Sequence, residues 1–449
     1  MKTQDIIDNN IFKTFLKYVS FNVISMLGMS LYVLADTFFI ANGVGKEGLI
    51  VLNLALPAFI GGINALGLML SMGVGTMYSI YLGKNEPNNA NSVFTQVMIL
   101  ALFLGSILTV LGITYSKNII AGLGASGDLI PLANEYIKTL FLFSFAFIFN
   151  HIIISMIRND GNPKLAMIAM LTGSISNIIL DYLFIFPLNM GMFGAALATG
   201  LAPIISLVIL SSHIFTKKNN FKLIKTKVKR SELSKVVFIG IPTYITEFST
   251  GIVLFVFNIV ILRIIGDIGV AAYGILANIS FVFIAIFIGI GQGIQPIISV
   301  SYGAGKMGYI KKILLYASYC TVLISCIFYI IFILYPDPII AAFNAENDML
   351  LHEIAKQGMR LYFPGFILIG LNIVIISFFS AIAKPRQSFI VSILRGMFLT
   401  IPAVLTLPHI WGINGVWLSV PIAELITLII GVRLIYLYFR YEISDNKIC

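Results

Sequence analysis

Three long stretches of the sequence contain no charged side chain. They run from Gly48 to Gly83, from Ser92 to Ser116 and from Ile268 to Gly305. An α-helix rises about 1.5 Å per residue, so about 20 apolar residues cross the ~30 Å hydrocarbon core of a bilayer. Strands of a membrane barrel would alternate polar and apolar residues, and these stretches do not. Because only helices and closed barrels satisfy the backbone in lipid, the stretches are predicted to be transmembrane helices.

Charge is scarce over the whole chain. Charged residues make up 11% of the 449 residues and hydrophobic residues 59%, whereas soluble proteins have about 25% and about 45–50%. The composition therefore excludes a string of soluble domains. The net charge of +10 gives no support to nucleic-acid binding, because the loops described below account for it. The three cysteines suggest neither a disulfide framework nor a metal site.

Breaking the chain at its polar loops predicts an all-α membrane protein with twelve transmembrane helices. The expected ranges are about 11–41, 48–82, 92–115, 129–157, 164–187, 193–215, 236–265, 270–302, 310–335, 349–383, 387–408 and 414–440. An even number of spans places both termini on the same side of the membrane. No metalloprotease, P-loop or nucleophile-elbow motif is present in the sequence.

The basic residues are distributed unequally between the two sets of loops. One set carries most of them, including the segment from Lys217 to Lys235, whereas the opposite set has only Lys46 and Lys117 between helices. The positive-inside rule then predicts a multi-pass protein of a bacterial-type inner membrane with both termini in the cytoplasm. The basic segment would also suit anionic lipid headgroups, although a topological role is the simpler interpretation.

The two halves of the chain resemble each other at an offset of 220–222 residues. The matched residues are Gly73, Ser79 and Gly83 with Gly293, Ser299 and Gly303, Asn150 with Asn372, and Gly194 with Gly415. We therefore predict two six-helix lobes, 1–215 and 236–449, related by a pseudo-two-fold axis along the membrane normal and joined by a basic cytoplasmic linker, 216–235. Such a pair of lobes suits a transporter with a central cavity; two fused bundles without a moving interface are the alternative.

Acidic residues inside the predicted helices are the first candidates for function, because a buried carboxylate costs several kcal/mol in lipid. Asp36, Asp181 and Thr199 each lie five or six residues from the outer end of a helix, which places them ~8–10 Å below the outer surface. Asn177 precedes Asp181 by four residues and shares its helical face.

This set of oxygen-bearing side chains suits a hard cation such as Na⁺, or a shared proton. The alternative is that both aspartates only satisfy backbone groups at kinks. The repeat assigns the chemistry to the N-terminal lobe, since the positions that match Asp36, Asp181 and Thr199 fall near Asn258, Ala403 and Val420.

The C-terminal lobe has two deeper acids. Glu247 and Glu424 lie about ten residues inside their helices, which places both near the membrane midplane. They either face a central cavity and attract cationic substrates or form a hydrogen-bonded structural pair. Arg395 is expected to extend toward the cytoplasmic interface, and His151 is interpreted as a satisfied polar residue.

Several segments together resemble the multidrug and toxic compound extrusion (MATE) family, in particular its MepA-like branch. They are LYVLADTFFIANGVG around Asp36, SNIILDYLFIF around Asp181, GAALAT ending at Thr199, GQGIQPIISVSYGAGK from Gly291 to Lys306, and GVWLSVPIAE ending at Glu424. The resemblance implies the MATE/MOP-type fold and an N-lobe cation site at the positions of Asp36, Asn177, Asp181 and Thr199.

The resemblance also implies the function. We expect an antiporter that exports small cationic or amphipathic organic compounds in exchange for Na⁺ or H⁺ by alternating access, without a cofactor and as a monomer in membrane lipid. A lipid-linked oligosaccharide flippase of the same superfamily is the alternative, but the helix interiors lack the expected cations. An enzyme is not expected, because the four histidines are scattered along the chain.

Overall fold

The computed structural model describes residues 10–125, 127, 129–344 and 348–445, with side chains through Arg440. Residues 1–9 and 446–449 of the expected cytoplasmic termini lie outside this range. The first half comprises α2 (Ile11–Gly43), α3 (Lys46–Ala58), the π-helix η1 (Phe59–Asn64), α4 (Ala65–Gly83), α5 (Pro87–Gly122), α6 (Leu129–Leu142), α7 (Ser144–Asn159), α8 (Pro163–Ile185) and α9 (Gly191–Phe215).

The second half repeats this order of long helices. It comprises α10 (Arg230–Ile265), α11 (Asp267–Gly303), α12 (Met307–Leu334), α13 (Pro336–Ala341), α14 (Met349–Tyr362), α15 (Gly365–Ala381), α16 (Pro385–Ile393), the π-helix η2 (Leu394–Phe398), α17 (Thr400–Thr406), α18 (Pro408–Trp411) and α19 (Ile413–Asp445). The prediction of an all-α membrane protein is confirmed.

The number of membrane crossings agrees with the sequence. In the described part of the chain, ten helical segments are long and apolar enough to span a bilayer, and two bent pairs, α6–α7 and α14–α15, raise the number to twelve. The pairs bend by 45° and 47°. Each was expected as one continuous helix, and the two bends occupy equivalent places in the two halves.

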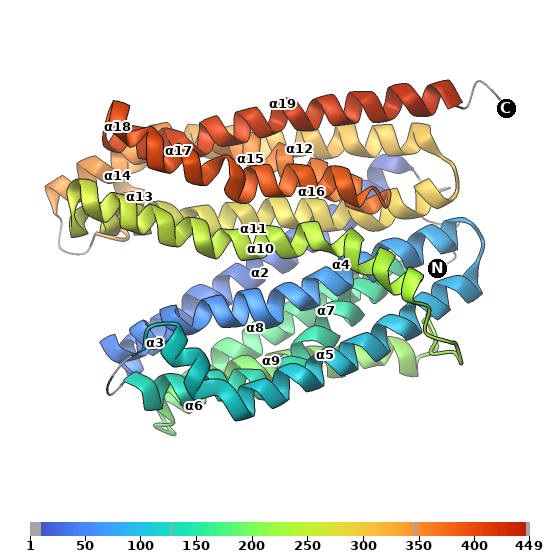
Figure 1. Ribbon diagram of the computed structural model, residues 1–449, viewed down its shortest axis with the longest axis horizontal. Coiled ribbons are helices and arrows are strands. Elements are labelled where there is room, and N and C mark those ends of the chain that lie inside the picture. The colour runs from blue at the N-terminus through green and yellow to red at the C-terminus, as the bar shows by residue number, and fades with distance from the viewer. Residues whose placement is uncertain (1–9, 126, 128, 345–347, 446–449) are drawn as a thin grey trace.

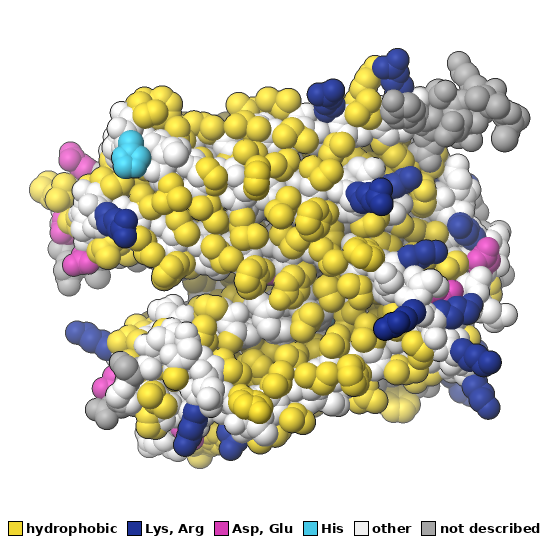
Figure 2. Space-filling view, in the orientation of Figure 1, with side chains coloured by type: hydrophobic (Ala, Val, Ile, Leu, Met, Phe, Trp, Pro, Cys, Tyr) yellow, Lys and Arg dark blue, Asp and Glu magenta, His cyan; other side chains and the backbone are white. Residues whose placement is uncertain are grey.

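The helices form two lobes (Figure 1). Figure 2 shows that the lobes separate at one end of the molecule and meet at the other, where the chain termini lie. Lys and Arg side chains gather at the closed end on the face shown. The arrangement is the one expected for a two-lobed transporter.

Glycines allow the lobes to approach closely at the closed end. A Cβ atom on Gly83 would lie 2.2 Å from the backbone oxygen of Val300, and one on Gly303 would lie 2.2 Å from that of Ile80. Small residues permit such close helix crossings in membranes. Gly83 and Gly303 are also partners in the sequence repeat, so the pseudo-two-fold axis passes near their contact.

The segment between the lobes is packed against the first lobe. The backbone N–H groups of Lys222, Ile224 and Lys229 donate to side chains of α5, at 2.8 Å, 3.0 Å and 2.7 Å. The side chain of Phe221, which belongs to this segment, is buried. We call residues 216–229 the strap, because they run across the end of α5 as an ordered layer.

Candidate ion-binding site

The four residues selected in the N-terminal lobe meet in one buried cluster. Asp36 comes from α2, Asn177 and Asp181 from α8, and Thr199 from α9. All four are buried, Asn177 and Asp181 completely. Helix α8 is well placed for this, because the Asn162 side chain caps its first turn and fixes where the helix begins.

Direct contacts join the members of this cluster. The carboxyl groups of Asp36 and Asp181 lie close enough to interact electrostatically. The Asn177 amide fits its neighbours best when its nitrogen donates to Asp181 Oδ2 at 3.1 Å and its oxygen accepts from the Thr199 backbone N–H at 3.3 Å. The spacing of four residues on α8 therefore aligns the amide and the carboxyl group as the sequence predicted.

The cluster has unused capacity to accept a cation. Oδ1 of Asp36 and Oδ1 of Asp181 are both buried and accept no hydrogen bond from the described residues. Two carboxyl groups in contact need either a proton between them or a cation that offsets their charges. Carboxylate, amide and hydroxyl oxygens suit a hard monovalent cation or a proton, so the residues fit both candidates.

Two tyrosines beside the cluster escaped the sequence analysis. Tyr32 on α2 and Tyr136 on α6 lie close enough to Asp36 and Asp181 to interact with them electrostatically. Tyr32 precedes Asp36 by four residues, so helical spacing was a signal that pointed to it. Nothing in the spacing pointed to Tyr136, because α6 reaches the cluster only through the tertiary fold.

The C-terminal lobe contains a different buried arrangement. Glu424 on α19 forms an ion pair with Arg395 of η2, with 3.0 Å between Glu424 Oε1 and Arg395 Nε. Asn372 on α15 donates to Glu424 Oε2 at 2.7 Å and to the Glu424 backbone oxygen at 2.9 Å. The expectation that Arg395 extends toward the interface is wrong, because the π-helical turn of η2 directs this side chain to a buried carboxylate.

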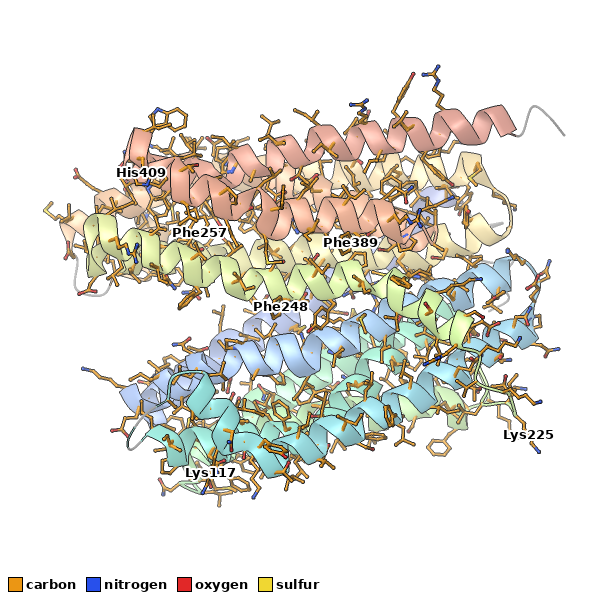
Figure 3. The ribbon with its side chains drawn as sticks, viewed as in Figure 1. Lys117, Lys225, Phe248, Phe257, Phe389 and His409 are labelled. Atoms are coloured by element: carbon orange, nitrogen blue, oxygen red, sulfur yellow. The ribbon has the colours of Figure 1, made fainter. Side chains whose placement is uncertain are left out.

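The two deep acids of this lobe, Glu247 and Glu424, have different surroundings. Glu424 pairs with Arg395, so the alternative in which Glu424 pairs with Glu247 is not the arrangement observed. Glu247 is half-buried on α10 beside Phe248, which points from α10 toward the first lobe (Figure 3). The Phe248 ring lies within 3.1 Å of where a Cβ on Gly61 would be. Of the two acids, Glu247 is the more exposed.

His151 has a defined partner within the first lobe. Its Nε2 atom lies 2.7 Å from Oδ1 of Asn64, at the end of η1. This agrees with the interpretation of His151 as a satisfied polar residue.

A polar network closes the end of the molecule where the lobes meet. Arg158 at the end of α7 donates to Gln292 Oε1 on α11 at 2.7 Å, and Asn159 donates to Gln295 Oε1 at 3.3 Å. Gln295 in turn donates to the Thr76 hydroxyl of α4 at 3.2 Å. Arg158 directly follows the range expected for the fourth helix, 129–157, where a loop residue would be exposed; in the structure it is buried.

The fold and these sites agree with comparisons to known proteins. The MatE family model matches residues 22–183 and 242–405. The chain belongs to the MATE family. The two matched segments begin and end at the offset found in the sequence, which confirms the internal repeat of this MATE protein. Membership of the family makes the protein a membrane transporter.

Individual relatives resemble the MATE chain over nearly all of its length. The multidrug export protein MepA of Staphylococcus aureus (strain MSSA476) is 25% identical over 433 residues, 95% of this chain and 94% of the relative. A crystal structure of MATE in complex with MaL6 superimposes with a TM-score of 0.92 at 25% identity, covering 100% of both chains. An outward-facing structure of a multidrug resistance MATE family transporter of the MOP superfamily gives 0.92 at 24% identity, covering 100% and 99%.

Proposed function

We propose that this MATE protein is a multidrug antiporter that exports small cationic or amphipathic organic compounds in exchange for Na⁺ or H⁺. The buried cluster of Asp36, Asn177, Asp181 and Thr199 carries the proposal. Two carboxyl groups with unused oxygens inside a transmembrane lobe are costly unless they bind a transported charge. The similarity to MepA proteins over nearly the whole chain supports the class of substrate.

The proposed cycle uses the open state seen in the structure. With both termini in the cytoplasm of a bacterial cell, the cleft faces outward and the ion enters the N-lobe cluster from outside. Ion binding offsets the aspartate charges and favours the conformation that releases substrate from the cleft. Exchange then follows, because the ion and the substrate favour opposite states of one conformational equilibrium.

Glu247 is the proposed contact for the positive charge of the substrate. It follows Tyr244 by three residues and precedes Phe248 on α10, and the centroids of these two rings are 6.2 Å apart. An acid next to aromatic faces attracts organic cations by charge and by cation–π contact. Glu424 is not proposed for this role, because Arg395 already balances its charge.

A lipid-linked oligosaccharide flippase is disfavoured by the placement of the buried cations. Arg395 is engaged by Glu424, and Arg158 by Gln292 at the closed end. Binding of a pyrophosphate headgroup would require cations that face the open cleft and are not engaged by other residues of the protein. These two arginines do not supply them.

The test is efflux of a fluorescent organic cation from proteoliposomes under an imposed Na⁺ or pH gradient. Asp36→Asn and Asp181→Asn are expected to reduce gradient-driven efflux at least about tenfold. Glu135→Gln serves as the matched control, because Glu135 is an exposed acid of the same lobe. If both asparagine variants export at the wild-type rate under both gradients, the N-lobe cluster is not the coupling site.

The same assay identifies the coupling ion. A Na⁺ gradient at equal pH drives efflux if the cluster binds Na⁺, and a pH gradient without Na⁺ drives it if the cluster binds a proton. If the organic cation leaves the vesicles down its own gradient without any counter-ion, the protein acts as a passive channel. This result would contradict the exchange mechanism. Glu247→Gln is expected to raise the KM for the cation and to leave uptake of the driving ion unchanged.

A further inference from the structure

A groove runs along the lipid-facing side of the C-terminal lobe. It lies between α12, α15 and α19 and encloses about 290 Å³, and a neighbouring groove of about 570 Å³ continues it along α19. Its lining is almost entirely apolar: Leu314, Leu315, Leu371, Ile375, Leu428, Val432, Ile435 and Phe439, with Ser318. The span from Leu428 to Phe439 corresponds to about 16 Å of helix, a length that suits most of an acyl chain.

Cationic side chains stand at one end of this groove. Lys311 lines both parts of it, and its Nζ lies 4.8 Å from the centroid of the Phe439 ring. Arg440 lines the second part beside it. Arg440 lies near the end of α19 that reaches the closed end of the molecule (Figure 1). The groove thus combines an apolar channel with a positive end.

In the first lobe the corresponding place, between α5 and α9, is covered by the strap. The strap brings Phe221 onto Phe94 of α5 and His213 of α9, with ring centroids 5.2 Å and 6.2 Å apart. Phe221 is 2% exposed there. The Asn91 side chain accepts the backbone N–H of Lys222 at 2.8 Å. The space between α5 and α9 is therefore filled by a large apolar side chain beneath an ordered strap.

The repeat relates these residues directly to the groove. At the offset of 220–222 residues, Asn91 corresponds to Lys311 and Phe94 to Leu314, while His213 corresponds to Ile435. All three counterparts line the groove. The second lobe has no equivalent of the strap within the residues that the structure describes, because α19 remains helical to Asp445 whereas α9 ends at Phe215.

We propose that this groove binds an anionic diacyl phospholipid, one acyl chain lying where Phe221 lies in the other lobe and the headgroup phosphate lying at Lys311. Asn91 in the first lobe accepts a hydrogen bond from a backbone N–H group of the strap. Its counterpart in the second lobe is Lys311, a cation, which suits a phosphate instead. Basic pockets between transmembrane helices on the cytoplasmic side recognise anionic headgroups in this way.

The proposal is tested with the full-length protein and a tryptophan reporter in the groove. Tyr436→Trp places the reporter on the second part of the groove, where Tyr436 is exposed, and Trp411→Phe removes an exposed native tryptophan. The protein is reconstituted at a fixed ratio of phosphatidylglycerol to phosphatidylcholine, and only one of the two lipids carries bromine. Brominated phosphatidylglycerol is expected to quench at a mole fraction about fivefold lower than brominated phosphatidylcholine.

Paired variants separate a specific site from general attraction. Lys311→Gln is expected to abolish the preference for phosphatidylglycerol, and Lys312→Gln to retain it, because Lys312 is exposed on α12 but does not line the groove. Ser318→Trp, which fills the groove, should reduce quenching by both lipids. The proposal is overturned if both lipids quench the reporter protein equally, or if the preference for phosphatidylglycerol survives Lys311→Gln. It is also overturned if this preference emerges only in a chain ending at Asp445, because the C-terminal tail would then be the occupant of the groove.

Discussion

The two lobes share one architecture but place opposite charges beside their buried acids. In the first lobe Asp181 faces a second acid, Asp36, across α2 and α8. In the second lobe Glu424 faces Arg395, which neutralises it within the protein. An acid that is balanced internally stabilises the fold, whereas an acid next to another acid needs a partner from outside. Repeated folds can therefore divide structural and coupling roles between their halves.

The largest expected effect comes from breaking the balanced pair. Glu424→Gln leaves Arg395 buried without its counter-charge, which costs about 3 kcal/mol or more of stability. The thermal midpoint of the purified protein in detergent should fall accordingly. The double variant Arg395→Met with Glu424→Leu should recover most of the loss, since it removes both charges. An unchanged midpoint for the single variant would contradict the assigned ion pair.

The same chemical change in the first lobe should have the opposite consequence. Asp181→Asn removes one of two neighbouring acids, so the thermal midpoint should stay the same or rise. Gradient-driven efflux should nevertheless fall at least about tenfold, equivalent to about 1.4 kcal/mol or more. Measuring both properties on the same preparation is decisive. If efflux by Asp181→Asn falls only as much as the amount of folded protein falls, the variant affects folding and not coupling. The contrast between the two lobes would then be lost.

A smaller effect is expected where the lobes meet. Arg158 of the first lobe donates to Gln292, whereas its repeat counterpart, Ser380, bonds Ser388 within the second lobe. Gln292→Ala should therefore weaken closure by about 1–2 kcal/mol. Hydrogen exchange of the backbone over residues 71–83 should accelerate by roughly five- to thirtyfold. Gln357→Ala, which removes a hydrogen bond to Asn414 away from the interface, should leave that exchange rate unchanged.

The smallest effect is expected at the open end. Hydrogen bonds from Lys356 and His352 hold the pKa of Asp337 below its ordinary value. Their contribution is therefore present at neutral pH and is lost as the pH falls through that lowered pKa. Asp337 is exposed, and exposed ion pairs contribute little. Asp337→Asn should shift the thermal midpoint at neutral pH by no more than about 1 °C; a larger drop would show that this end of the second lobe is more strongly coupled to the core.

Much of this architecture was accessible from the sequence. Uncharged stretches predicted the spans, and counting residues from helix ends brought Asp36 and Asp181 to one depth, where the structure joins them. Depth does not specify how a helix is rotated, so the pairing of Arg395 with Glu424 was missed. The π-helical turn that sets that rotation has no clear signal in the sequence.

Contacts between lobes were the other feature beyond the reach of the sequence. Arg158 lies next to a polar turn, and its position in the chain is typical of a cytoplasmic loop residue. Its burial depends on α11 of the other lobe, more than 130 residues away. Tyr136 was missed because it is brought near the aspartates only by packing within the first lobe, where α6 lies against α5 and α9.

The strap has a mechanical consequence for movement of the lobes. Its 14 residues, 216–229, would reach about 48 Å if they were extended and free. They are instead fixed to α5, and Gln96 also donates to Glu232 in the first turn of α10 at 2.8 Å. The strap therefore cannot extend to let the two lobes move apart, and its anchored end acts as a pivot. Displacement must grow with distance from that pivot, so a small rotation near Glu232 becomes a large opening at the far mouth of the cleft.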